Sequence, residues 1–388
     1  MMLLKNFKRF FNKALRQPLY AAGVFRKRLA AQMHYRFSDG KSSNPEAITL
    51  FLTHKCNLHC KMCGQWGEGG ITKKASAQFV QSELPLDDIK KLVDEASAFR
   101  PNITLFGGEP LLHAHAVDII RYIKSKGMHC LVITNGFLLD KMAEELVSSG
   151  LDELNVSFDG GAALHDEIRG MLGLFDRIMS GLKEVNRFKR LGSRKKPLVN
   201  LQCTITKYNY LHLEQMLAVA EEARADSLTF HNLIFTNKKL LEEQRPYDEL
   251  LGASSKDWEG FDFEPEIDPK ALYEKLQPIL TGKYPFNVDL YPNFSSEELI
   301  RYYRDPCFMA SSAPSDLTAR CLSPWIVAYV FPDGEVRPCL NCTYSFGNIK
   351  DRPFRDIWNS EKAIGFRRVL KKNRIFPLCR RCTELYRY

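Results

Sequence analysis

Residues 48–63 read ITLFLTHKCNLHCKMC and place three cysteines in a loop directly after an apolar run. The run ITLFLT has the β-branched, apolar character of a buried strand. Cys56, Cys60 and Cys63 follow it with the spacing C-x3-C-x2-C. Thiolates are the usual ligands of iron–sulfur clusters, and these three can bind three irons of a [4Fe–4S] cubane. The fourth iron would keep an open position for a small molecule, as catalytic metal sites do.

Zinc is the alternative metal for this loop. His54 or His59 could supply the fourth ligand that a structural zinc ion requires. Structural zinc usually takes its ligands in pairs, however, and these three cysteines do not form two pairs. The spacing therefore favours the cluster.

Strand-like runs and helical patterns alternate along the chain from residue 48 to about residue 234. The predicted strands span residues 48–53, 102–106, 129–134, 153–158, 198–205 and 227–234. One predicted helix begins near Leu86, and the others span residues 115–126, 139–149, 174–190 and 211–224. One helix between successive strands indicates an α/β fold with a parallel sheet, either an open doubly wound sheet or part of a (β/α) barrel.

Short polar segments follow four of the predicted strands. The cysteine loop follows the first, GGEP (107–110) the second, TNG (134–136) the third and DG (159–160) the fourth. Ligands of parallel α/β folds bind at the carboxyl ends of the strands. We therefore expect these four loops to meet at one rim and to form the active site.

In this context the cysteine loop resembles that of the radical S-adenosylmethionine superfamily. Met62 stands where many members have an aromatic residue. The resemblance covers residues 48 to about 234 and implies a partial (β/α)6 TIM-like barrel. It further implies that S-adenosylmethionine chelates the open iron and is cleaved by one electron to a 5′-deoxyadenosyl radical, which abstracts a substrate hydrogen.

The resemblance also implies a set of cofactor-binding residues at the same rim. Gly107, Gly108 and Glu109 match the segment that approaches the amino group of the cofactor. Ser157 and Asp159 match polar residues that bind its ribose, and Asn135 is a further contact or a turn former. Arg169 matches an arginine that contacts the carboxylate of the cofactor; the alternative is a surface ion pair. The predicted cofactor-binding residues are Gly107, Gly108, Glu109, Asn135, Ser157, Asp159 and Arg169.

A second group of cysteines lies near the C-terminal end, after residue 320. WIVAYVF, PDG and EVRPC read as a hairpin, and two C-x2-C pairs follow at 339–342 and 379–382. Two such pairs could form a zinc ribbon, but Cys321 would have no part in it. The pattern resembles the SPASM/twitch extension of the same superfamily. That resemblance implies an auxiliary [4Fe–4S] cluster held by Cys321, Cys339, Cys379 and Cys382.

Four cysteines are not assigned to a cluster. Cys130, Cys203 and Cys307 belong to no recognisable ligand motif, and Cys342 is not needed by the auxiliary cluster. Cys130 and Cys203 lie within predicted strands, where a buried free thiol is usual. On the resemblance Cys342 is spare, and Cys307 is a candidate fifth ligand of the auxiliary cluster or a residue of the radical chemistry.

Charge is concentrated at the N-terminal end. Residues 1–40 contain nine basic residues and one acidic residue, Asp39, so they carry +8 of the net charge of +9. Residues 3–16 have the spacing of an amphipathic helix, which can lie on an anionic membrane or pack on the main domain with its charges solvated. A charged tail is not a groove-lining patch, so no nucleic-acid partner is expected.

Eleven cysteines, no secretory signal and no span of ~20 apolar residues indicate a reducing, cytoplasmic setting, with possible contact at the inner membrane face. We expect a basic helical extension at 1–40, a radical core at 46–235, a helical and loop insertion at 236–320 and the auxiliary-cluster domain at 321–388. The insertion is expected to hold helices at about 237–251 and 269–280.

The predicted protein is a radical enzyme that acts on a peptide, sugar or lipid-linked substrate and receives its electron from a flavodoxin or ferredoxin. The alternative function is a zinc-stabilised interaction or nucleic-acid module without catalysis.

Overall fold

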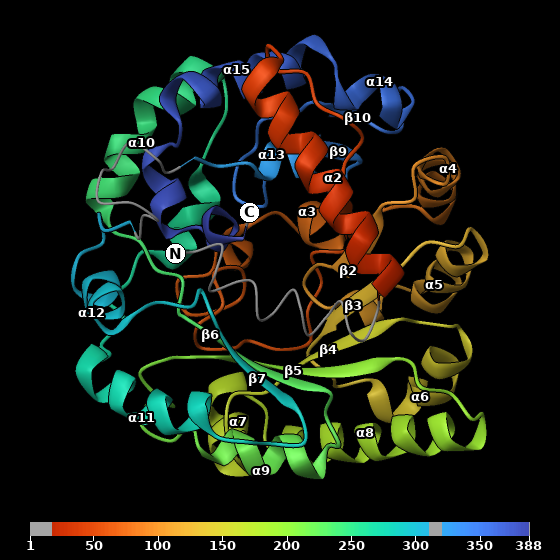
Figure 1. Cartoon of the computed structure of the whole chain (residues 1–388), viewed down its shortest axis with the longest axis vertical. Helices are drawn as coiled ribbons and strands as arrows, with labels where there is room; N and C mark the ends of the chain where they lie inside the picture. The colour runs from red at the N-terminus through yellow and green to blue at the C-terminus, as the bar shows by residue number, and fades with distance from the viewer. Residues whose placement is uncertain (1–17, 310–319, 388) are drawn as a thin grey trace.

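A computed structural model describes residues 18–309 and 320–387 of the chain (Figure 1). Its ten strands form one sheet in the order β10-β9-β8-β1-β2-β3-β4-β5-β6-β7. The strands are β1 (Ala47–Phe51), β2 (Asn102–Phe106), β3 (Cys130–Thr134), β4 (Glu153–Ser157), β5 (Leu198–Thr204), β6 (Ser227–His231), β7 (Asn287–Tyr291), β8 (Val327–Val330), β9 (Glu335–Arg337) and β10 (Gly347–Asn348).

Strands β1 to β7 run parallel in chain order, and β8 pairs parallel with the free side of β1. Helices cover the outer side of this curved sheet (Figure 1). The helices of the described residues are α2 (Pro18–Phe37), α3 (Ala77–Gln81), α4 (Leu86–Ala96), α5 (Ala116–Ser125), α6 (Leu139–Ser148), α7 (Ala162–Arg169), α8 (Leu174–Leu191), α9 (Gln215–Glu222), α10 (Lys238–Leu251), α11 (Pro269–Thr281), α12 (Ser296–Arg304), α13 (Ser323–Ile326), α14 (Phe354–Trp358) and α15 (Glu361–Asn373).

The α/β fold and the predicted strands are confirmed, and the structure adds two features to them. A further parallel strand, β7, lies inside the predicted insertion and extends the sheet beyond β6. The predicted hairpin is present as β8 and β9, but β8 also pairs with β1, so the C-terminal region continues the sheet of the core.

Most predicted helices are confirmed. Those in the insertion correspond to α10 and α11, and helix α7, which ends at Arg169, was not predicted. Of the predicted N-terminal helix, α2 lies within the described residues, whereas residues 3–16 lie outside them. Residues 38–45 connect α2 to β1 and form neither helix nor strand.

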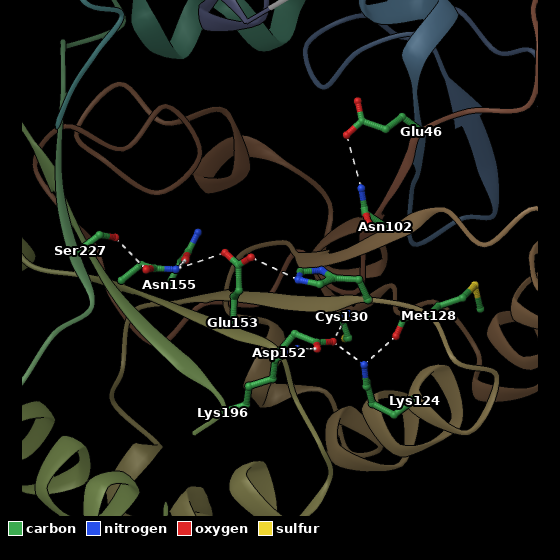
Figure 2. Close-up of polar contacts among 12 residues, drawn as sticks. Glu46, Asn102, Lys124, Met128, Cys130, Asp152, Glu153, Asn155, Lys196 and Ser227 are labelled. Carbon is green, nitrogen blue, oxygen red and sulfur yellow. Dashed lines mark hydrogen bonds and ion pairs between the residues drawn. The ribbon is translucent and has the colours of Figure 1, made fainter. Parts of the chain in front are cut away.

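The strands divide their side chains between two faces. In β2 and β5 every second residue is buried, and these residues, such as Ile103, Leu105 and Leu201, join the apolar core with the buried faces of the helices. Apart from Leu198, the alternate residues of β4 and β5 are polar and point to the inside of the curve, as Glu153 and Asn155 do in Figure 2. The inside of the barrel is therefore polar along these two strands.

A hydrogen-bonded network occupies this interior near the amino ends of the strands (Figure 2). Asn200 donates through Nδ2 to Asn155 Oδ1 at 2.9 Å and to Glu153 Oε2 at 3.3 Å. Ser227 donates to Asn200 Oδ1 at 2.7 Å, and His129 Nε2 lies 3.2 Å from Glu153 Oε1. Residues at this end of a barrel usually serve stability, so the reactive rim is expected at the opposite end.

Candidate active site

The cysteine loop is joined by backbone hydrogen bonds to the segment that follows β2. Gly108 N donates to Thr53 O at 2.8 Å, and Glu109 N donates to Lys55 O at 2.8 Å. A Cβ atom on Gly108 would lie 2.2 Å from Lys55 O, and Gly107 has φ +149°. The two glycines are therefore required where this segment approaches the cysteine loop itself.

Each of the three sulfur atoms has at least one N–H group beside it. Asn135 Nδ2 lies 3.9 Å from Cys56 Sγ, and Arg169 Nη1 lies 3.7 Å from Cys60 Sγ. The backbone N–H of Trp66 donates to Cys63 Sγ at 3.4 Å. Donors of this kind stabilise thiolates and tune the potential of a cluster that the thiolates bind.

Glu109 is a buried carboxylate that ties loops of the rim together. Its Oε1 accepts from Thr134 Oγ1 at 2.7 Å and from Leu111 N at 3.1 Å, and its Oε2 accepts from Asn135 N at 2.7 Å. Burial raises the pKa of Glu109 to about 7, although these hydrogen bonds oppose the shift. Both oxygens already accept protein hydrogen bonds, so any contact with the cofactor would have to share them.

Arg169 and Asp159 form a buried ion pair next to Cys60. Arg169 Nε donates to Asp159 Oδ2 at 2.6 Å, and Asp159 Oδ1 accepts from Thr204 N at 2.9 Å. Burial alone would lower the pKa of Arg169, but the Asp159 carboxylate and the Cys60 thiol raise it. This is not the surface ion pair considered from the sequence. The predicted contacts of both residues with the cofactor stay predictions.

The other predicted cofactor residues also lie at this rim. Ser157 is half-buried at the end of β4, beside Gln202 of β5. Asn135 donates through Nδ2 to Asn57 Oδ1 at 2.9 Å, and the Nδ2 of Asn57 is buried without a hydrogen-bond partner. A buried unused donor beside Cys56 is consistent with an anionic group binding there.

The C-terminal cysteines form a second thiol group, and it includes Cys342. The thiols of Cys339 and Cys342 share a hydrogen bond. Cys321 is buried within electrostatic reach of Cys379 and Cys382, and burial raises the pKa of its thiol. Cys307 packs in the same apolar cluster as Cys382. The structure thus brings the predicted ligands together with Cys342, whereas Cys307 shares only the apolar cluster with Cys382.

This second group is fastened to the carboxyl ends of the last parallel strands. Tyr291, the final residue of β7, donates through its hydroxyl to Thr383 O at 2.6 Å. Arg381 Nε donates to Phe235 O, four residues beyond the end of β6, at 2.9 Å. The two cysteine groups therefore lie on one rim.

A short 3-10 helix, η3 (Lys256–Phe261), connects the two groups. A Cβ atom on Gly260 would lie 2.0 Å from Gly64 O, so η3 packs closely on the residue after Cys63. Trp258 and Phe261 of η3 pack in the cluster that contains Cys382. The insertion thus bridges the two cysteine groups.

The thiol arrangement can be compared with what each metal requires. Within residues 18–309 and 320–387, no group of three or more His, Cys, Asp or Glu residues is close enough to share one metal ion. The thiolates that hold a [4Fe–4S] cluster can lie farther apart than the ligands of a single ion, because each thiolate binds a different iron. Burial raises the pKa of Cys56 to about 12 and that of Cys382 to about 12, so binding iron would release protons from both groups.

A parallel barrel with three cysteines after its first strand, and further thiols at the same rim, defines a class of cluster-binding barrel protein. Residues 50–197 match the model of the radical SAM superfamily, and residues 321–383 match that of the SPASM iron–sulfur cluster-binding domain. The chain belongs to the radical SAM superfamily and carries a SPASM domain. It is an enzyme whose cofactors are S-adenosylmethionine and [4Fe–4S] clusters, one in the core and one auxiliary.

Two curated proteins align with this chain over most of its length. It is 28% identical over 355 residues to the AdoMet-dependent heme synthase of Methanosarcina barkeri, covering 87% of this chain and 88% of that protein. It is 29% identical over 319 residues to the Fe-coproporphyrin III synthase of the same organism, covering 79% and 72%.

A solved structure shares the fold. It is that of Streptococcus suis SuiB bound to precursor peptide SuiA, which aligns with a TM-score of 0.61 at 14% identity and covers 88% of this chain and 71% of that one.

No helix among the described residues is long and apolar enough to cross a membrane.

Proposed function

We propose that the chain uses Cys56, Cys60 and Cys63 to hold the radical-generating cluster, and that it oxidises a substrate bound inside the barrel mouth. When bound, the cluster and S-adenosylmethionine supply a 5′-deoxyadenosyl radical. One observation carries the proposal: the three thiols lie on one loop after β1, and each of them has at least one N–H donor beside it.

The chain's own residues would prepare the site in three ways. Glu109 joins the segments after β2 and β3, so that Asn135 faces Cys56. Asp159 holds the guanidinium of Arg169 beside Cys60. The half-buried Ser157 faces the polar interior, where the ribose of the cofactor could bind. The remaining polar interior would accept the substrate.

The auxiliary cluster is proposed to be held by Cys321, Cys339, Cys379 and Cys382 and to accept the electron left on an oxidised substrate. Its position on the same rim supports this role, because electron transfer requires proximity. A flavodoxin or ferredoxin in a reducing cytoplasm would supply the electron for the first cluster. Cys342, which is hydrogen-bonded to Cys339, is the alternative ligand in place of Cys339.

The metal content tests this proposal against the zinc-stabilised alternative. Protein purified without oxygen should be brown and contain about eight irons per chain, as two cubanes require. Cys342→Ser should keep this content, whereas Cys379→Ser should lower it to about four. Colourless protein that contains zinc would contradict the proposal.

The substrate is proposed to be a peptide, a sugar or a lipid-linked molecule. SuiB is described with a precursor peptide, which supports a peptide. The names of the heme and Fe-coproporphyrin III synthases add a tetrapyrrole to the classes to be screened. Under reducing conditions without oxygen, the true substrate should increase the formation of 5′-deoxyadenosine and itself lose hydrogen, as mass spectrometry would measure.

Helix α2 is proposed to contact an anionic membrane surface. Phe25, Leu29, Met33 and Phe37 recur every four residues, and they are 60%, 49%, 51% and 70% exposed. This spacing places them on one helix face. Residues 1–37 contain nine basic residues and no acidic residue. An apolar stripe with basic surroundings fits anionic lipid, and like charge disfavours pairing with a second copy.

Contact through α2 would leave the cysteine rim facing water. Arg28 of α2 pairs at 2.8 Å with Glu46, the residue before β1, and Tyr35 packs on Trp325, just before β8. Both partners lie at amino ends of strands, whereas the cysteine loop follows the carboxyl end of β1. A substrate would therefore approach from the side away from the lipid.

Vesicle sedimentation tests this contact. Leu29→Glu with Met33→Glu should weaken binding to vesicles containing phosphatidylglycerol at least tenfold, because each buried Leu or Met contributes about 1.5–3 kcal/mol. The matched control is Leu172→Glu with Leu191→Glu, which changes two leucines that are 97% and 70% exposed elsewhere. Equal binding by both variants, or equal binding to neutral vesicles, would refute the contact.

A further inference from the structure

A fully buried guanidinium lies within the last C-x2-C pair. Arg381 stands between Cys379 and Cys382, and its side chain is 0% exposed. Its Nε donates to Phe235 O at 2.9 Å, and its Nη1 donates to Tyr302 O at 3.1 Å. The ring centroids of Phe235 and Tyr302 each lie 3.9 Å from the Cζ atom of Arg381. The position of this charge is thus fixed from several sides.

Arg381 has no carboxylate partner among the described residues. Its hydrogen-bond partners are both backbone carbonyl oxygens, and its Nη2 is buried without a hydrogen-bond partner. The neighbouring Arg380 instead pairs with Glu243 at 3.5 Å, and Arg387 pairs with Glu384 at 3.0 Å. A buried cation without a paired anion is strongly destabilising, so a compensating anion is expected close by.

The adjacent thiols supply that anion when they bind iron. A [4Fe–4S] cluster held by four thiolates carries net negative charge, and each further electron makes it more negative. The backbone places Arg381 within the turn that these two cysteines close. Cys382 N donates to Cys379 O at 3.1 Å, and Arg381 lies at the end of η5 (Pro377–Arg381) inside that turn.

We propose that Arg381 is a positioning residue that holds a buried positive charge against the auxiliary cluster and thereby raises the reduction potential of that cluster. The inference rests on the proposed assignment of Cys379 and Cys382 as ligands. A fixed cation stabilises the reduced, more negative state more than the oxidised state. The electron from the substrate would therefore pass more readily to this cluster.

The test is a redox titration of the auxiliary cluster, followed by electron paramagnetic resonance. It is made in full-length protein with Cys56, Cys60 and Cys63 changed to Ala, so that only this cluster gives a signal. Absence of any cluster in this background would contradict the ligand assignment, which is separate from a failure of the inference about Arg381.

Arg381→Gln should lower the potential, so that the ratio of reduced to oxidised cluster falls at least tenfold at a fixed potential, or about 59 mV for one electron. Arg381→Lys keeps the charge but loses the fork that binds two carbonyls, and should stay closer to the parent protein although its thermal stability falls. Arg380→Gln is the matched control, since that half-buried side chain pairs with Glu243. It should leave the potential unchanged.

Two results would overturn the inference. One is an Arg381→Gln protein with a loaded cluster and an unchanged potential. The other is an Arg381→Lys protein whose potential falls as far as that of Arg381→Gln, because the loss would then follow the lost hydrogen bonds and not the lost charge. If the Arg381→Gln protein does not bind the auxiliary cluster, the test compares the Arg381→Lys protein with the Arg380→Gln protein. A fall of tenfold or more in the ratio of reduced to oxidised cluster in Arg381→Lys would then overturn the inference.

Discussion

Changing Cys56, Cys60 and Cys63 to Ala is expected to abolish 5′-deoxyadenosine formation and to lower the iron content from about eight to about four per chain. The three thiols lie on one loop and are the proposed protein ligands of the core cluster. Without them the core retains no cluster ligand, whereas the second thiol group is untouched. Chromatography of the quenched reaction and iron analysis would measure both effects.

The control for this variant removes two other thiols from the same barrel. Cys130 and Cys203 are 0% exposed, lie in β3 and β5 and contact the apolar core. Cys130→Ala with Cys203→Ala should therefore cost some stability but keep both clusters and the formation of 5′-deoxyadenosine. Persistent 5′-deoxyadenosine in the variant that lacks Cys56, Cys60 and Cys63 would contradict the assignment.

The second large effect is expected on stability at the Arg169–Asp159 pair. Arg169→Met leaves the Asp159 carboxylate, which is 0% exposed, without its cationic partner. Breaking a buried pair in this way typically costs about 3–5 kcal/mol of the free energy of unfolding. The variant also removes the donor beside Cys60 and should lower the iron content of the core. Urea unfolding of the metal-free, reduced chain would measure the first effect.

The double variant, Arg169→Met with Asp159→Asn, provides the comparison. It removes both charges, so it should recover a large part of the stability that Arg169→Met loses. If the two changes simply add, the pair does not act as a buried ion pair, and the account of this corner of the site is wrong.

The sequence predicted the parts of the fold that depend on local patterns. Alternating apolar runs identified six strands of the barrel, and the loops after four of them identified the rim. Strand β7 was missed because NVDLY is short, only partly apolar and set between Pro285 and Pro292 in a loop-rich region. The pairing of β8 with β1 joins residues about 280 positions apart, which local patterns do not reveal.

The candidate site was predicted as a set of residues but not as a set of contacts. The resemblance predicted that Glu109 and Arg169 contact the cofactor, yet both side chains already bind protein groups. The sequence could not show this, because tertiary structure decides which groups face each side chain. Arg380 and Arg381 are equivalent in the sequence CRRC, but one is half-buried in an ion pair and the other fully buried between two rings. Only the position of η5 (Pro377–Arg381) on the barrel rim separates them.

The central claim is that the cluster held by Cys56, Cys60 and Cys63 keeps one iron open for S-adenosylmethionine. The most direct test uses protein with Cys379 and Cys382 changed to Ala, in which the core cluster alone should remain. Its reduced cluster should give an electron paramagnetic resonance spectrum that changes when S-adenosylmethionine is added. A spectrum that does not change at saturating S-adenosylmethionine would mean that all four irons are already ligated, and would contradict the account.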